Sequence, residues 1–178
     1  MGTHIESYFP RAVEPTLGAV LAQLSQVFTQ LEPDLAAIRQ RGGFSQGTAP
    51  WSLFQTDTGI DGEGPCGFSI LVFPQVVEFT SIERFGTLES REHGIHESLR
   101  RVFEVVAASL GSSGEFAVAA GGFGDTDHAC ALAADGASFG EVRDRLEARL
   151  GPPARSWREL ETGPGLWLLR GPTLSTES

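Results

Sequence analysis

The chain has 178 residues, of which 40% are hydrophobic and 20% are charged, and this balance excludes intrinsic disorder as a description of the whole. The formal net charge is −10, from 23 acidic residues and 13 basic residues, all of them arginine. This charge opposes binding along a nucleic-acid backbone and favours a basic protein partner. Lys and Asn, whose codons begin with two adenines, are both absent. This absence indicates a GC-rich bacterial gene.

The segment from Met1 to Pro10 lacks the basic region and apolar run of a signal peptide. No apolar stretch reaches the length of a membrane span. We therefore expect a cytoplasmic protein. In a reducing compartment the two cysteines, Cys66 and Cys130, are expected to be buried free thiols.

Residues 13–41 have the apolar spacing of a helix. Apolar side chains recur at steps of three and four residues, as helical periodicity requires, and they are Leu17, Val20, Leu21, Leu24, Val27, Phe28 and Leu31. Pro33 divides this stretch into a long helix and a short one, and the Gly42-Gly43 pair ends it.

Residues 49–85 change to a strand-like pattern. Trp51, Leu53 and Phe54 indicate a short strand, and the Gly-rich segment 56–65 is expected to be a loop. Residues 68–73 form a nearly continuous apolar run that is typical of a central strand. After Pro74-Gln75, residues 76–82 predict a partner strand or an extension of it.

Residues 89–110 predict the clearest helix, which Gly111 ends. Two short β-like runs follow, at 115–120 and 128–134, with a loop at 121–127 between them. A capping box of Ser138 and Glu141 begins a helix over 138–150, and residues 166–169 form a last strand.

Strands that come in adjacent groups predict an α+β fold with a mixed or antiparallel sheet and about three helices packed on it. We expect one domain over 1–171 and a polar tail over 172–178.

Two groups of residues could bind a metal ion. His93 and His96 lie three apart on a predicted helix, but the zinc-peptidase pattern needs a spacing of four. Residues Asp125, Asp127, His128 and Cys130 include metal-ligand types, without a second ligand cluster at a standard spacing. The plainer interpretation is a polar first helical turn in one case, and a loop followed by a core cysteine in the other. We predict no metal and no cofactor.

Catalytic motifs are also incomplete. Gly67-Phe68-Ser69 lies within a predicted strand and is not a nucleophile elbow. The glycines at 121–124 lack the Lys-Ser/Thr pair of a phosphate-binding loop. We therefore assign no catalytic residue.

The placement of acidic residues is more informative. Segment 56–65 contains Asp57, Asp61 and Glu63 without a basic residue, and no Arg occurs between Arg101 and Arg143. Acidic loops on a rigid sheet are well placed to meet a basic partner, although a merely solvated rim has the same composition. The predicted partner-binding residues are Asp57, Asp61, Glu63, Asp125 and Asp127. Trp51 and Phe123 are possible aromatic anchors or core residues.

The start of the chain adds a resemblance. The segment Tyr8-Phe9-Pro10-Arg11, followed by an amphipathic helix and by residues 31–35 (LEPDL), resembles the opening of some bacterial immunity proteins of polymorphic toxin systems. The likeness covers about the first 40 residues and assigns no binding residue. It implies a small acidic protein that neutralises a cognate toxin. A small metal-dependent enzyme, using His93/His96 or Asp127/His128/Cys130, and an accessory subunit of a larger assembly are the alternatives.

Overall fold

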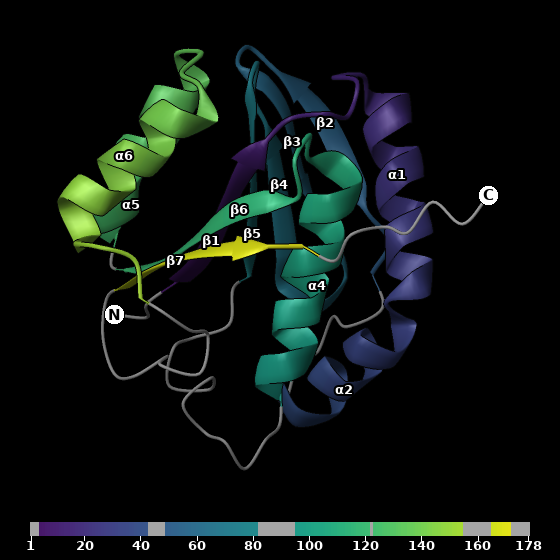
Figure 1. Cartoon of the computed structure of the whole chain (residues 1–178). Helices are drawn as coiled ribbons and strands as arrows, with labels where there is room; N and C mark the ends of the chain where they lie inside the picture. The colour runs from purple at the N-terminus through teal and green to yellow at the C-terminus, as the bar shows by residue number, and fades with distance from the viewer. Residues whose placement is uncertain (1–3, 43–48, 82–94, 122, 155–164, 172–178) are drawn as a thin grey trace.

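The computed structural model describes residues 4–42, 49–81, 95–121, 123–154 and 165–171. In this part of the chain, one antiparallel sheet lies between two layers of helices (Figure 1). The strands are β1 (His4–Pro10), β2 (Ser52–Thr56), β3 (Gly59–Glu63), β4 (Phe68–Val72), β5 (Val76–Ser81), β6 (Glu115–Gly121) and β7 (Gly165–Arg170). They follow the order β2-β3-β4-β5-β1-β6-β7, and all neighbours are antiparallel.

The helices have clear local causes. They are α1 (Leu17–Gln30), α2 (Glu32–Gly42), α4 (Ile95–Leu110), α5 (Phe123–Ala134) and α6 (Phe139–Leu150), with the short 3-10 turn η1 (Pro65–Gly67) before β4. Thr16 caps α1 by accepting a hydrogen bond from the backbone N–H of Ala19. The predicted capping box begins α6, because Ser138 and Glu141 each accept a hydrogen bond from the other's backbone N–H.

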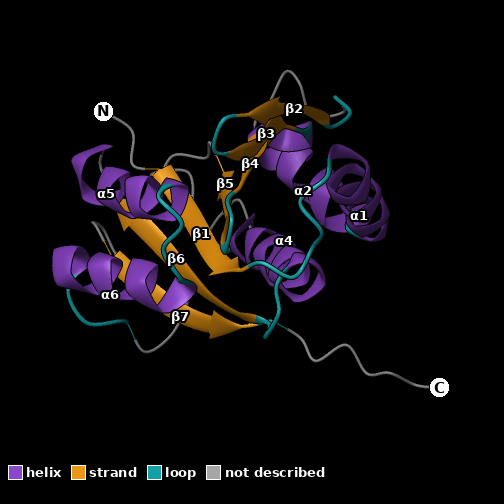
Figure 2. Cartoon of the chain, turned by 90° about the horizontal axis from the view of Figure 1, so that it is seen from above, coloured by secondary structure: helices purple, strands orange, loops and turns teal. Residues whose placement is uncertain are grey.

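One face of the sheet carries the larger apolar core. Helices α1, α2 and α4 cover it, as the view from above shows (Figure 2). Aromatic rings of the helical layer and of the sheet meet there: Phe28 of α1, Phe103 of α4, and Phe68 and Phe79 of the sheet. The stacked pair Phe68–Phe79 has ring centroids 5.2 Å apart. Such pairs add to the stabilisation that burial alone provides.

The other face is covered by α5 and α6, which lie over β1, β6 and β7 (Figure 2). Small side chains allow this close approach: Ala117 and Ala119 of β6 face Ala129 and Ala133 of α5, and all four are buried. This second core is smaller and does not extend beneath β2 and β3.

The structure confirms the α+β class and the antiparallel form of the sheet. The division of the first helical stretch is also observed, since α1 ends at Gln30 and α2 begins at Glu32. The part of the 89–110 prediction at 89–94 lies outside the described residues. The described part contains five helices, more than the three predicted.

Three predictions of secondary structure were wrong. Residues 128–134, expected to be a strand, belong to α5, which also takes up most of the expected loop 121–127. Segment 56–65, expected to be a loop, contains the hairpin turn and all of β3 (Gly59–Glu63), whereas the short strand expected just before it is confirmed as β2. The β1 strand at the start of the chain was not predicted, although it pairs with both β5 and β6 at the centre of the sheet.

Candidate functional site

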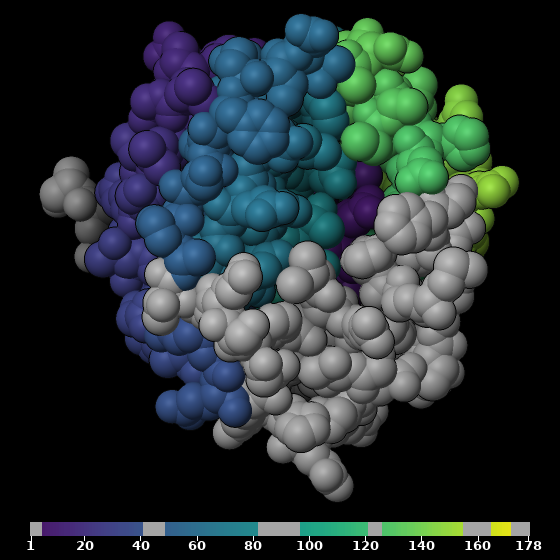
Figure 3. All heavy atoms as spheres, turned by 180° about the vertical axis from the view of Figure 1, so that it is seen from behind, coloured from purple at the N-terminus to yellow at the C-terminus, as the bar shows by residue number. Residues whose placement is uncertain are grey.

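On the side of α5 and α6, the second apolar core includes no residue of β2 or β3 in the described part of the chain, and it reaches β4 only at Leu71. Seen from behind, these strands form the surface between the α1/α2 layer and the pair α5/α6 (Figure 3). Phe54 of β2 stands on this side and is 54% exposed. On β4, Ser69 and Leu71 are half-buried, whereas Ile70 between them faces the aromatic core. We call this surface, made of Phe54, Asp61, Glu63, Ser69 and Leu71, the open face.

Acidic side chains stand on the open face because of the sheet register. Asp61 lies opposite Phe54 and Leu71, and Glu63 lies opposite Ser69. Side chains that are paired across strands point to the same side of a sheet. Asp57 is exposed in the turn between β2 and β3. Asp57, Asp61 and Glu63 form no ion pair within the described part of the chain.

The same face continues into a buried pair of carboxyl groups. Leu71 lies opposite Glu78 of β5, and Glu78 lies opposite Tyr8 of β1. Glu6 lies opposite Thr80 and is therefore a diagonal neighbour of Glu78. The row Asp61–Leu71–Glu78–Tyr8 thus runs from the open face to the sheet beneath α5.

Hydroxyl groups satisfy most of the oxygen atoms of this pair. The Tyr8 hydroxyl donates to Glu6 Oε2 at 2.8 Å, and the Thr126 hydroxyl of α5 donates to Glu6 Oε1 at 3.1 Å. The Thr80 hydroxyl donates to Glu78 Oε1 at 3.2 Å. Glu78 Oε2 is buried and has no hydrogen-bond partner among the described residues.

Burial controls the electrostatics of the cluster. It raises the pKa of Glu78 to about 7, and the neighbouring Glu6 carboxylate and the more distant Asp61 act in the same direction. Burial, with Glu78 and Glu6 nearby, also raises the pKa of the Tyr8 phenol well above its ordinary value. Both shifts favour the protonated form, because this buried and acidic surrounding disfavours further negative charge.

Helix α5 closes one side of the cluster. Its Cys130 thiol lies against the Glu78 carboxyl group, and burial together with Glu78 raises the pKa of Cys130 to about 12. Asp127 is exposed on the same helix and acts in the same direction on Cys130. Of the predicted residues, Asp61 thus raises the pKa of Glu78, and Asp127 raises the pKa of Cys130. The side chain of Asp125, also within α5, lies outside the described residues.

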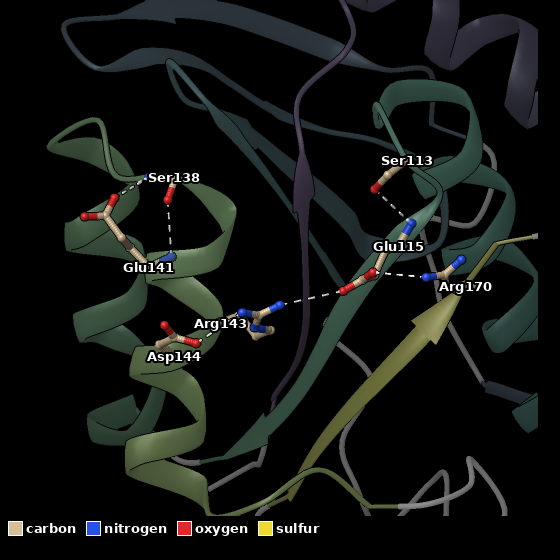
Figure 4. A network of polar contacts seen from close by, with 7 residues as sticks. All are labelled: Ser113, Glu115, Ser138, Glu141, Arg143, Asp144 and Arg170. Carbon is tan, nitrogen blue, oxygen red and sulfur yellow. Dashed lines mark hydrogen bonds and ion pairs between the residues drawn. The ribbon is translucent and has the colours of Figure 1, made fainter.

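Other acids from the arginine-free interval have partners. Glu115 of β6 forms ion pairs with Arg143 of α6 (3.9 Å) and Arg170 of β7 (3.7 Å), as Figure 4 shows. Glu141 caps its own helix, and Glu104 forms an ion pair with Arg100 at 2.7 Å. These three acids hold secondary-structure elements together, whereas Asp57, Asp61 and Glu63 form no such contacts within the described ranges.

The proposed metal ligands do not come together in the described part of the chain. No group of three His, Cys, Asp or Glu side chains there could hold a metal ion. His128 is exposed on α5, whereas Cys130 turns towards the sheet. His93 and the side chain of His96 lie outside the described residues. Both cysteines are free thiols; Cys66 is buried in the aromatic core, and Cys130 is half-buried on the opposite face.

Of the two candidate aromatic anchors, Trp51 has a described side chain. Trp51 packs against Phe28 with ring centroids 5.1 Å apart, and its indole covers Gly64 so closely that a Cβ there would lie 2.4 Å from the ring. Trp51 therefore belongs to the core side, where it also lines a pocket of about 410 Å³ formed by α1, α2, residues 49–51 and Pro65. The side chain of Phe123 lies outside the described residues. Phe54 is the exposed aromatic residue of the open face.

Sequence reasoning missed Glu6 and Glu78, the two central residues. Glu78 lies within the β-rich run 76–82, and an acid at that position of an apolar strand was the available signal. Glu6 lies on β1, a strand that the sequence analysis did not predict, so the position of Glu6 in the sheet could not be inferred.

Comparison with protein-family models, with curated proteins and with solved structures finds no match for this chain. No helix in the described ranges combines the length and apolar character needed to cross a bilayer.

Proposed function

We propose that the protein is a binding protein that docks a basic partner protein on its open face. One observation carries the proposal: the described stretch 49–81 places Asp61, Glu63 and Glu78 on one side of the sheet and contains no Arg, Lys or His. An acidic surface of this kind accelerates the capture of a basic protein and disfavours acidic ones.

The open face also offers an apolar contact. Phe54 is 54% exposed and stands opposite Asp61, so an aromatic ring and a carboxylate are presented together. Aromatic residues within a polar surround are typical of the residues that dominate binding energy at interfaces. A partner that combines basic side chains with an apolar patch fits this surface.

A toxin domain is the partner that we favour, with the protein acting as its immunity protein. Support comes from the net charge of −10 and from the resemblance of the first 40 residues to bacterial immunity proteins. Steric and electrostatic blockade of a toxin needs no catalytic group, and a binding face of this kind would be sufficient for it.

The test is the binding of the product of the adjacent gene, measured by surface plasmon resonance at several salt concentrations. We expect the association rate to fall steeply with salt, and to fall about tenfold in a variant carrying both Asp61→Asn and Glu63→Gln. The matched control is Asp144→Asn with Glu147→Gln on α6, which removes the same charge from the opposite end of the molecule. Equal association rates for the two double variants, or rates independent of salt, would contradict the proposal.

A further inference from the structure

Glu78 lies at the boundary between the open face and the part of the sheet that α5 covers. On one side it is paired with Leu71, which is half-buried and adjoins Asp61. On the other side it is paired with Tyr8, which is fully buried. A side chain of a partner that lies over Leu71 on the open face would therefore reach Glu78 before it reaches Tyr8.

The carboxyl group of Glu78 is incompletely satisfied for a buried acid. The residue is only 7% exposed, Oε1 accepts one hydrogen bond from Thr80, and the Cys130 thiol contacts the carboxyl group. Within the described residues no N–H or O–H group donates to Oε2, so a weak thiol donor is all that lies near it. Buried carboxylates are normally paired with a cation or fully hydrogen-bonded, because an unpaired one is costly. The charged groups that face Glu78 are instead acidic: Glu6 of β1 and Asp61 of β3.

We infer that Glu78 is the anchor of the proposed interface and receives an arginine side chain of the basic partner. The inference rests on the proposed function and names the residue that gives it specificity. A guanidinium group suits the site better than an ammonium group, because it loses its hydration more readily and can donate to both oxygens of one carboxylate. The apolar stem of the arginine would lie over Leu71 while its head reaches Glu78.

The experiment uses the full chain and, as the probe, a hexa-arginine peptide that is acetylated at one end and amidated at the other. Isothermal titration calorimetry at about pH 7, in two buffers of different ionisation enthalpy, measures both affinity and proton release. Glu78 is partly protonated at this pH, and a guanidinium beside it favours the ionised form. Binding to the wild-type protein is therefore expected to release protons. The other titratable groups around Glu78 in the described part of the chain are Glu6 and Tyr8 of β1, Asp61 of β3, and Cys130 of α5, which Asp127 in turn influences.

Two substitutions of the same chemical kind separate anchoring from general charge. Glu78→Gln is expected to weaken binding at least about tenfold and to abolish proton release. Glu63→Gln, which removes an exposed carboxylate from the same face, is expected to weaken binding only a few-fold and to retain proton release. Equal affinities for the two variants, with proton release unchanged in both, would overturn the anchor and leave the acidic face in place. No binding of the peptide to the wild-type protein would overturn both proposals.

A second pair of variants keeps Glu78 intact and covers the case in which Glu78→Gln fails to fold. Leu71→Lys places an ammonium group of the protein itself beside Glu78, and is expected to eliminate proton release on peptide binding. Ser69→Lys adds the same charge on the same strand and the same face, opposite Glu63, and is expected to retain it. Identical proton release from these two variants would contradict the inference.

Discussion

The two faces of the sheet carry different kinds of side chains. The face beneath α1, α2 and α4 is filled with large apolar and aromatic side chains, including the pair Phe68 and Phe79. The face beneath α5 and α6 combines alanines with a buried carboxyl pair, and among the described residues its apolar core does not extend to β2 and β3. The first face therefore supplies most of the stability, whereas the second gives up stability to hold charge near a surface. We therefore look for function on the second face, where apolar packing is less extensive.

The largest expected effect tests the stabilising face. Phe79→Ala removes a fully buried ring that contacts Phe28, Phe68 and Phe103, and should lower the free energy of unfolding by about 3–5 kcal/mol. The matched control is Phe54→Ala on the open face, which should change it by no more than about 0.5 kcal/mol. Urea denaturation followed by circular dichroism measures both. Similar losses for the two variants would show that the two faces do not differ in this way.

The next effect tests the energetic cost of the polar face. The pKa of Glu78 is about 7 in the folded protein, against an ordinary value of 4.5. The folded state thus binds this proton more tightly than the unfolded state does. The contribution of Glu78 to stability is most favourable below pH 4.5 and is lost as the pH rises through 7, by up to about 3 kcal/mol.

Glu78→Gln should remove that pH dependence and make the protein more stable than the wild type at about pH 8. Urea denaturation at several pH values between about 5 and 8 measures the difference between the two proteins. A variant that is less stable than the wild type at the alkaline end of this range would show that the Glu78 carboxylate stabilises the fold. Stabilisation together with weaker peptide binding is the combination expected of a residue kept for binding.

Sequence periodicity was sufficient for the parts of the fold in which one pattern dominates. The apolar steps of α1 and α4, and the capping box at Ser138, needed no tertiary information. Helix α5 was missed because its glycine-rich approach, its alanines and its lack of an amphipathic stripe resemble a loop followed by a strand. In the folded protein its alanines pack in one core with Ala117 and Ala119 of β6, a contact between distant segments that no local pattern encodes.

The candidate site could be predicted only in part, because some of its residues come together through contacts between distant segments. Asp57, Asp61 and Glu63 are close in sequence, and their excess of negative charge was visible there. The pairing of Glu6 with Thr80, and of Glu78 with Tyr8, joins segments about 70 residues apart through β-sheet register. Register depends on the whole sheet, so the buried carboxyl pair became recognisable only in the folded structure.

The smallest expected effects compare the acids at the two ends of the sheet. Arg143→Ala removes partners of Glu115 and Asp144, and should lower the free energy of unfolding by about 0.2–1 kcal/mol, because all three side chains are partly exposed. Asp61→Asn should leave stability unchanged or raise it slightly. Asp61 has no ion pair within the described ranges, and its charge disfavours the ionised form of Glu78. Thermal unfolding at low and high salt measures both variants, and salt should reduce the loss caused by Arg143→Ala. A larger loss for Asp61→Asn than for Arg143→Ala would mean that Asp61 is held by the fold, and the open face would then no longer differ from the ion-paired end of the sheet.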